Sequence, residues 1–460
     1  MSLANTDSGD PLDRLSRFAA ELTWAVIPHA ARERAQLALR DTIGTIFGGA
    51  ATTAARIATQ AAVMYPGATP ILGATVFSAA PLAAFASAVS ASALDFDDGH
   101  YLGGGIHPGS VIVSSLLTAA SSLRVTTAEI LTAQVAGYEI ALRAAHLLWP
   151  GHDTDDYHCT GTAATLGAAA AVTKLRGGDA ERISRSIAIA WAHAPMSTFQ
   201  LPMVKESIGW SAASAYFAAD LAATGFMAPR VTGCSTIGRI LPPTPFHRPG
   251  AMSDPFIASL GEVFECSNTY FKPYAACRYT HAAARALADL IATHALVPAD
   301  LVAIEVHTHR GALFLDDQRP PTLEHGQYSF PFVLSAIVCD GAAGHEQIND
   351  AELANPVRLA EAAKITVHHD PQMDSLYPQH YAARIVLRTS DGRCINADRM
   401  LSPGDLDDPM SSDELAAKFV AMCTPHLGDA TTELSYLLVA PDRVHEYDLF
   451  ARLTSQAVAS

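Results

Sequence analysis

The first ~265 residues show one helical pattern after another, and this succession limits the fold more than any other feature. Pro28 is expected at a first helical position, and Thr126 or Thr127 is expected to cap a later helix that carries Glu129 near its start. The expected helices cover Ala30–Phe47, a segment from Thr126 or Thr127 to Leu142, Thr162–Arg176, Asp179–His193 and Ser207–Thr224. Abundant alanine predicts that these helices approach one another closely. This is the pattern of a helical domain and excludes an alternating β-α-β fold.

The pattern changes after Tyr270. Residues 301–309 alternate apolar and polar side chains as a half-buried strand does. Further strands are expected at Ile365–His368, Tyr381–Thr389 and Cys394–Arg399, the last two joined by a Ser390-Asp391-Gly392-Arg393 turn. Helices are expected at Ala282–His294 and Phe330–Asp340. This part of the chain therefore predicts an α+β domain.

Near the end of the chain, Ser411 and Glu414 form a capping-box pattern that opens one more helix, Leu415–Met422. We therefore predict that the C-terminus returns to the helical domain. The expected fold is mainly α, with residues 1–268 and 406–460 in one helical domain and residues 269–405 in an inserted α+β domain.

Charge and composition exclude several functions. Asp and Glu total 46 against 30 Lys and Arg, so the net charge is −16, which disfavours nucleic acid and anionic membranes as partners. Hydrophobic residues make up 49% of the chain and charged residues 17%, the reverse of a disordered chain. A small anionic substrate stays open, because a few local cations can outweigh the global field.

Targeting and cofactor signals are also missing. Residues 1–10 lack the basic and apolar regions of a secretory signal, and no stretch is apolar enough for a membrane span, so we expect a soluble cytoplasmic protein. The seven cysteines are scattered and predict neither disulfides nor a cysteine-based zinc site. No phosphate-binding, dinucleotide-binding, nucleophile-elbow or zincin motif occurs.

The densest polar cluster spans residues 95–108 on a glycine-rich turn. Its acidic and imidazole side chains are Asp95, Asp97, Asp98, His100 and His107. An aspartate beside a histidine orients the imidazole and raises its pKa, so we favour a functional role for the cluster. Helix capping and an ordinary turn are the structural alternative, and a metal site built on the same side chains is another.

Four further places carry candidate chemistry. His158 precedes a helix of small residues, where anions are attracted. Lys205 stands at the apolar start of a helix and is a candidate carboxylate anchor, unless it is solvated beside Glu206. Between the helical and the mixed parts of the chain, where clefts usually form, two cations and an imidazole suit a polyanionic substrate. These are Lys272, Arg278 and His281, and the alternative for this segment is an ordinary interdomain linker. Tyr328 follows in the polar start of an apolar helix, and the alternative there is an ordinary helix start.

These motifs also carry a resemblance over nearly the whole chain. They are Asp41-Thr42-Ile43-Gly44, Leu94-Asp95-Phe96-Asp97-Asp98, His107-Pro108, Gly137-Tyr138-Glu139, His158-x-Thr160-Gly161, Lys205, Thr280-His281, Gln327-Tyr328-Ser329, and the tail from Pro409 through Leu415 to Lys418-Phe419. Because these motifs occur in this order and spacing, the chain resembles the MmgE/PrpD family, which includes 2-methylcitrate dehydratase, cis-aconitate decarboxylase and iminodisuccinate epimerase. One departure is Gly99, because relatives that are dehydratases or decarboxylases usually have Thr after the two aspartates.

The resemblance implies a helical domain built from both chain ends, an inserted α+β lid and a homodimer. It places the active site between helical domain and lid, without cofactor or metal. The family's site residues fall on Asp95, His107, His158, Lys205, His281 and Tyr328.

The shared chemistry would be proton transfer at a carbon next to a carboxylate, which needs cations for the carboxylate and a base near the carbon. Lys205 and His281 are assigned to carboxylate binding, His107 and His158 to base and acid, and Tyr328 to hydrogen-bond or proton donation. Asp95 would orient His107. The further candidate substrate-binding residues are His100, Lys272 and Arg278.

We expect a cofactor-independent lyase, a dehydratase or decarboxylase, that acts on a small di- or tricarboxylate. The alternatives are an epimerase of an iminodisuccinate-like dicarboxylate, a non-catalytic polycarboxylate-binding dimer and a metal-dependent hydrolase.

Overall fold

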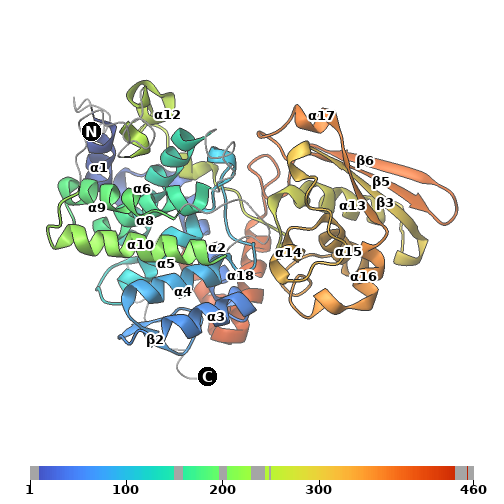
Figure 1. Ribbon diagram of the computed structural model, residues 1–460, viewed down its shortest axis with the longest axis horizontal. Coiled ribbons are helices and arrows are strands. Elements are labelled where there is room, and N and C mark those ends of the chain that lie inside the picture. The colour runs from blue at the N-terminus through green and yellow to red at the C-terminus, as the bar shows by residue number, and fades with distance from the viewer. Residues whose placement is uncertain are drawn as a thin grey trace.

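The computed structural model describes residues 10–149, 159–195, 205–228, 244–247, 250–440 and Leu453. Figure 1 shows two parts side by side, one built of helices and one that holds a small sheet with helices against it. Each part has its own hydrophobic core. The predicted mainly α fold with an α+β insertion is therefore confirmed.

The helical part contains every helix expected there, together with further helices that were not named from the sequence. Its members are α1 (Pro11–Glu21), α2 (His29–Gly49), α3 (Thr53–Ala62), α4 (Ala80–Ser92), α5 (Pro108–Ala120), α6 (Thr127–Leu148), α8 (Cys159–Leu175), α9 (Ala180–Ala192), α10 (Lys205–Ala223) and the short α12 (Pro255–Ala258). The expected ones among these are α2, α6, α8, α9 and α10. Thr126 and Glu129 form the capping box that opens α6, and Asp179 caps α9. Pro28 is the residue before α2 rather than its first residue.

A small strand pair within the helical part was not expected. β1 (Thr69–Pro70) pairs antiparallel with β2 (Phe77–Ser78). Each strand has two residues, so neither can show the alternation by which a strand is recognised in a sequence.

Small residues allow the central helices to approach closely. α6 and α8 cross where Gly137 faces Gly167, and a Cβ atom on Gly167 would lie 2.3 Å from the carbonyl oxygen of Gly137. The same helices contribute many fully buried alanines to the core. The predicted tight approach of alanine-rich helices is therefore confirmed at this crossing.

The α+β part contains one four-stranded sheet in the order β4-β3-β5-β6. Its strands are β3 (Leu301–Thr308), β4 (Ile365–His369), β5 (Ala383–Thr389) and β6 (Cys394–Arg399). β3 pairs parallel with β4 and antiparallel with β5, and the predicted β5–β6 hairpin turns at Gly392, whose φ is +85°. The helices of this part are α13 (His281–Thr293), α14 (Leu323–Gln327), α15 (Phe330–Asp340), α16 (Pro356–Ala362) and α17 (Pro371–Asp374).

The chain then returns to the helical part, as Figure 1 shows for α18 beside α2. α18 (Ser412–Leu427) begins with the predicted capping box of Ser411 and Glu414, and α19 (Ala430–Val439) follows. Phe419 and Cys423 of α18 are buried in the same core as Ile43 of α2. The boundaries at 268/269 and 405/406 remain predictions.

The two cores meet at the segment that follows α4. Leu94 and Phe96 come from the helical part of the chain, yet both are buried in the core of the α+β part, together with Met422 of α18. The backbone between Leu94 and Phe96 is thus held at the seam between the two parts.

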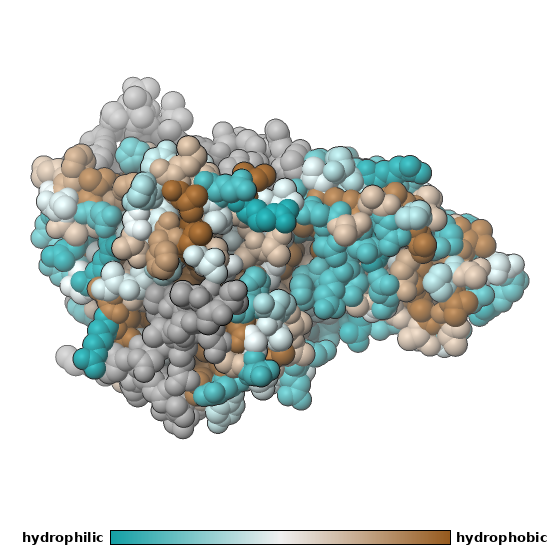
Figure 2. All heavy atoms as spheres, turned by 90° about the horizontal axis from the view of Figure 1, so that it is seen from below, coloured by the Kyte–Doolittle hydropathy of each residue, from teal (hydrophilic) through white to brown (hydrophobic). Residues whose placement is uncertain are grey.

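No helix among the described residues is long and apolar enough to cross a membrane. On the face in Figure 2, hydrophobic and hydrophilic residues alternate in small areas, and no broad apolar band crosses the coloured surface. Oligomeric state and cellular location remain predictions.

The helix crossing at Gly167 gives a stability prediction. Gly167→Ala places a methyl group against the Gly137 carbonyl, so the free energy of unfolding should fall by about 1–3 kcal/mol. Urea unfolding followed by circular dichroism measures the change. Gly344→Ala is the matched control, because its nearest neighbour would lie at 3.4 Å. Equal unfolding midpoints for the two variants would contradict the close crossing.

Candidate active site

Asp95 occupies a strained position at the end of α4. Its backbone is left-handed, with φ at +50°, and its N–H donates to the carbonyl of Ser92 at 3.0 Å. Aspartate is one of the few non-glycine residues that tolerate this conformation. The flanking Leu94 and Phe96 are buried in the neighbouring core, so they hold the backbone in place. The fold thus fixes the carboxylate of Asp95 at the seam.

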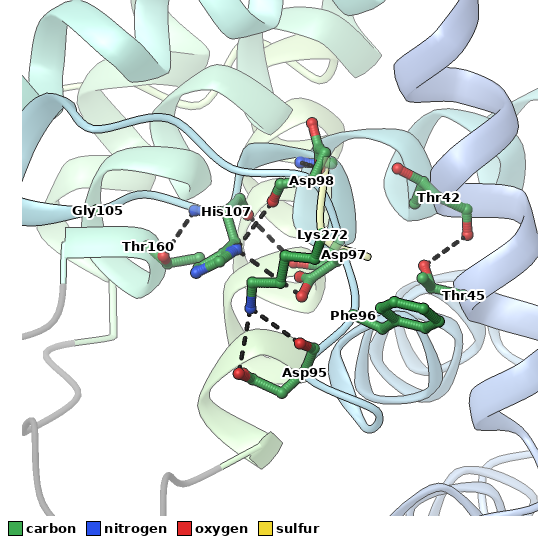
Figure 3. A network of polar contacts seen from close by, with 12 residues as sticks. Thr42, Thr45, Asp95, Phe96, Asp97, Asp98, Gly105, His107, Thr160 and Lys272 are labelled. Carbon is green, nitrogen blue, oxygen red and sulfur yellow. Dashed lines mark hydrogen bonds and ion pairs between the residues drawn. The ribbon is translucent and has the colours of Figure 1, made fainter. Parts of the chain in front are cut away.

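Two lysines and a tyrosine surround this carboxylate. Lys205 Nζ lies 3.1 Å from Oδ1, and Lys272 Nζ lies 3.1 Å from Oδ2 and 2.9 Å from the carbonyl oxygen of Asp95 (Figure 3 shows the Lys272 contacts). The Tyr328 hydroxyl donates to Oδ1 at 3.4 Å. Two ammonium groups and one carboxylate leave one net positive charge in a cluster whose side chains are at most 5% exposed.

The charges set the ionisation of Asp95. Burial alone would raise its pKa, but Lys205, Lys272 and then His107 outweigh burial and hold the pKa far below its usual range. Burial raises the pKa of Tyr328 well above its ordinary value, and Asp95 adds to the effect. Asp95 is therefore an anion, while Tyr328 keeps its proton.

The partners of Asp95 come from distant segments of the chain. Lys205 is the first residue of α10, Lys272 precedes α13, and Tyr328 stands between α14 and α15. Gln327 adds a direct hydrogen bond between the two parts, because its amide nitrogen donates to the carbonyl of Ala93 at 2.8 Å. The cluster therefore joins the helical and the α+β parts.

His107 lies in the same cluster at the start of α5. Its backbone N–H donates to Thr160 Oγ1 at 3.0 Å, and its ring Nδ1 lies 2.8 Å from the carbonyl oxygen of Asp98 (Figure 3). A carbonyl oxygen only accepts, so this contact assigns the proton of a neutral ring to Nδ1 and leaves Nε2 as an acceptor. Burial, and then Lys272, lower the pKa of His107 against the opposing effect of Asp97 and Asp95. The geometry thus presents a neutral imidazole with a basic Nε2.

Asp97 and Asp98 support this imidazole in different ways. Asp97 Oδ1 is 3.8 Å from His107 Nδ1. Asp98 accepts hydrogen bonds from the Tyr138 hydroxyl at 2.8 Å and from the backbone of Gly109 at 3.1 Å. Burial, and then Asp41, raise the pKa of Asp98 well above its usual range. Asp98 is thus a buried carboxyl group that fixes the loop bearing His107 to α5 and α6.

The structure gives His281 and Arg278 roles within the protein. Both ring nitrogens of His281 have partners, Nε2 with the carbonyl of Ala276 at 3.0 Å and Nδ1 with Arg278 Nη1 at 3.1 Å. Arg278 also binds the carboxylate of Asp405 and the carbonyls of Ser402 and Pro403. These contacts are all within the protein, and the substrate-binding roles expected for both side chains remain predictions. Arg278 anchors the loop before α18, and His281 orients Arg278.

His100 stands apart from the cluster. His100 Nδ1 accepts from the backbone of Leu102 at 3.1 Å, and its electrostatic neighbours are Glu265 and Arg143 rather than Asp95. Burial lowers the pKa of His100 to about 4. His158 lies outside the described residues, two positions before Thr160. Of the nine predicted site residues, Asp95, His107, Lys205, Lys272 and Tyr328 are brought together. His281 lies at their edge: burial, and then Arg278 and Lys272, lower its pKa well below the ordinary value, against the opposing effect of Asp95.

The positions of the described side chains also concern the alternative of a metal site. Among the residues that the structure describes, no three His, Cys, Asp or Glu side chains are placed to hold a metal ion. His307 and His368 stack on adjacent strands with ring centroids 5.2 Å apart, far along the chain from Asp97 and Asp98. The described part of the chain therefore gives no support to a metal-dependent hydrolase.

Two supports of the site were missed from the sequence. Lys418 of α18 binds Asp41 Oδ1 and the carbonyl oxygen of Phe96, both at 2.7 Å. A lysine among apolar neighbours at helical spacing, Leu415 and Met422, is the signal that indicates such a buried cation. The second support is Tyr270, whose ring packs against the ring of His107. Its place two residues before Lys272 is the only signal in the sequence that indicates it.

Comparison with known proteins identifies the family of this chain. The sequence model of the MmgE/PrpD N-terminal domain matches residues 13–235, and that of the C-terminal domain matches residues 274–439. The chain belongs to the MmgE/PrpD family. It is 24% identical to human cis-aconitate decarboxylase over 424 residues, which cover 87% of this chain and 85% of that enzyme. The mouse enzyme of the same name is 25% identical over 419 residues, covering 87% and 84%. The family resemblance predicted from the motifs is confirmed.

Asp95 carries a stability prediction for this MmgE/PrpD protein. Asp95→Asn keeps the shape and the tolerance of the left-handed backbone but leaves two buried lysines without an anion. The free energy of unfolding at pH 7 should fall by about 3–5 kcal/mol, and the second substitution Lys272→Met should restore part of it. Asp289→Asn, which weakens the solvent-accessible ion pairs of a half-exposed carboxylate with Arg285 and Arg399, should change stability by less than about 1 kcal/mol.

The effect of Asp95→Asn should depend on pH. The folded-state pKa of Asp95 is depressed, so its contribution is present above the unfolded value of about 3.9 and is lost as pH falls towards the folded value. Unfolding curves between pH 7 and pH 3 should therefore show the gap between wild type and variant shrinking below pH ~4. A gap that stays constant over this range would contradict the ion cluster.

Proposed function

We propose that this MmgE/PrpD protein is a lyase, a dehydratase or decarboxylase, that acts on a small di- or tricarboxylate by proton transfer next to a carboxylate. One observation carries the proposal: two buried lysines share the carboxylate of Asp95, and a neutral imidazole lies beside them. A carboxylate substrate would be a second anionic partner for these two ammonium groups. The similarity to cis-aconitate decarboxylases supports the same class of reaction.

Lys205 is the substrate-binding cation in this proposal. Among the described residues its ammonium group has one hydrogen-bond acceptor, Asp95 Oδ1, so two of its three donors can serve a substrate carboxylate. The ammonium group of Lys272 donates to two acceptors of Asp95, the carboxylate and the backbone carbonyl, so fewer of its donors are left for a substrate. Lys272 and Asp95 thus hold Lys205 in place, and the field of both ammonium groups stabilises negative charge that develops next to the bound carboxylate.

His107 Nε2 is the base. The Nδ1 contact to the Asp98 carbonyl fixes the ring, and the lowered pKa keeps it unprotonated at neutral pH. The Tyr328 hydroxyl is the proton or hydrogen-bond donor, because it keeps its proton and its present bond to Asp95 is long. His158, outside the described residues, remains a candidate for the second proton-transfer group.

The bond that breaks at the carbon decides the reaction. Proton removal followed by expulsion of a β-hydroxyl group as water makes a dehydratase. A decarboxylase needs no prior proton removal: the C–C bond to CO₂ breaks, its electron pair stays on the substrate, and one proton donated to that carbon, for example by the Tyr328 hydroxyl, completes the product. Return of a proton to the opposite face makes an epimerase, and the same residues would serve. The named relatives favour the lyase outcomes, with cis-aconitate as the first substrate to test.

A substrate panel tests the proposal. Citrate, 2-methylcitrate, cis-aconitate and iminodisuccinate are incubated in D₂O with wild type and His107→Gln, and NMR follows deuterium uptake, water loss, CO₂ loss and inversion. Wild type should convert at least one of them, and His107→Gln should lower kcat by about 100-fold or more. His294→Gln, an exposed histidine, is the matched control. Full turnover by His107→Gln would remove the base from the mechanism, and no reaction with any compound would favour a binder.

The pH dependence of the reaction gives a further prediction. His107 must be neutral to accept a proton, and its pKa lies below the ordinary 6.5, so kcat/KM should hold through pH 6.5 and fall only at lower pH. A pH profile of kcat/KM measures this, corrected for the substrate's own titration. An acid limb centred above pH 6.5 would contradict the assignment.

A further inference from the structure

Tyr270 occupies the space of a side chain that Gly99 does not have. The backbones of the two residues pair as a short antiparallel bridge, with N–O distances of 3.1 and 2.8 Å. A Cβ atom on Gly99 would lie 2.4 Å from both the Cζ and the hydroxyl oxygen of Tyr270. No other residue fits at position 99 while the phenol stands there, so Gly99 and Tyr270 act as one unit.

The ring of Tyr270 is held at the loop that carries the site. It meets the His107 ring edge to face, at 89° and with centroids 6.4 Å apart. The guanidinium carbon of Arg278 lies 4.3 Å from its centroid, and the Tyr101 ring lies 5.0 Å away. Arg278 is itself fixed by Asp405. The phenol thus has a rigid setting next to the proposed base.

The hydroxyl of Tyr270 has no hydrogen-bond partner in the described structure, although the residue is only 1% exposed. Its neighbour Tyr101 differs, because that hydroxyl donates to both carboxylate oxygens of Asp405 at 2.7 and 2.8 Å. The hydroxyl oxygen is not one of the fully enclosed side-chain atoms that lack a partner, so the small exposed part of Tyr270 includes this oxygen. A ligand that binds beside His107 can therefore reach the hydroxyl and become its hydrogen-bond partner.

We propose that Tyr270 is a substrate-binding residue, whose hydroxyl donates a hydrogen bond to a carboxylate oxygen of the substrate bound beside His107. The inference rests on the proposed function and adds a specificity residue to it. Gly99 is then a positioning residue, since it acts by leaving room for the phenol. Together the two residues would select substrates that have two carboxylates, one bound by Lys205 and a second one near the His107 ring.

Tyr270→Phe tests the proposal because it removes the hydroxyl alone. The melting temperature of the free protein should stay the same or rise, since no hydrogen bond within the protein is lost. Binding of the panel carboxylate that wild type binds best, measured by calorimetry, should weaken at least about tenfold. Tyr101→Phe is the matched control: it should lower the melting temperature and leave carboxylate affinity nearly unchanged.

Each outcome of this experiment either supports or overturns the role of Tyr270. A lower melting temperature for Tyr270→Phe, or wild-type affinity in that variant, would overturn the role of Tyr270 and leave the proposed function standing. If wild type itself neither binds nor converts any compound of the panel, the proposed function fails and the Tyr270 inference fails with it.

Gly99→Ala provides an independent check. The methyl group displaces the phenol, so carboxylate binding should weaken about as much as in Tyr270→Phe. The double variant should bind no more weakly than either single variant, because both remove the same hydrogen bond. Additive losses in the double variant would show that Gly99 does not act through Tyr270.

Discussion

The buried carboxylate of Asp95, held between two lysines, is the interaction on which the rest of the structure depends. A charge taken out of water is tolerated only with partners at hydrogen-bond distance, and here the partners come from α10, from the segment before α13 and from the α14–α15 junction. Satisfying one carboxylate therefore requires the helical part and the α+β part to close on each other. The same closure brings two buried ammonium groups to one carboxylate.

A second buried ion pair holds the other side of the same loop. Lys418 binds Asp41 and the carbonyl of Phe96, so α18, from the far end of the chain, fixes the residue next to Asp95. This explains physically why the chain must return to the helical part after the insertion. In a protein with a net charge of −16, cations that are scarce overall are thus buried around residues 95–96.

Much of the fold could be predicted because it depends on local patterns. Capping boxes at Thr126 and Ser411 and the turn at Gly392 are signals within a few residues, and the structure confirms them. The site was predictable only in part, since a sequence indicates which residues carry chemistry but not where their side chains point. Arg278 and His281 are close in sequence to Lys272, yet they satisfy each other and the loop before α18, while Lys272 turns to Asp95. Motif residues such as Tyr138 and Glu139 likewise support the scaffold, the first through Asp98 and the second through Arg143.

The glycine at position 99 shows why a missing side chain is weak evidence for a missing function. Related dehydratases and decarboxylases usually have a threonine there, and the sequence alone suggests that a hydroxyl has been lost. In the structure a phenol from residue 270, far along the chain, fills that position and brings a hydroxyl of its own. A tyrosine reaches further than a threonine and is held by a ring contact to Arg278, so the donor is more rigid and differently placed. Under the proposed role of Tyr270, such a replacement would change which carboxylate is bound and leave the proposed proton-transfer residues in place.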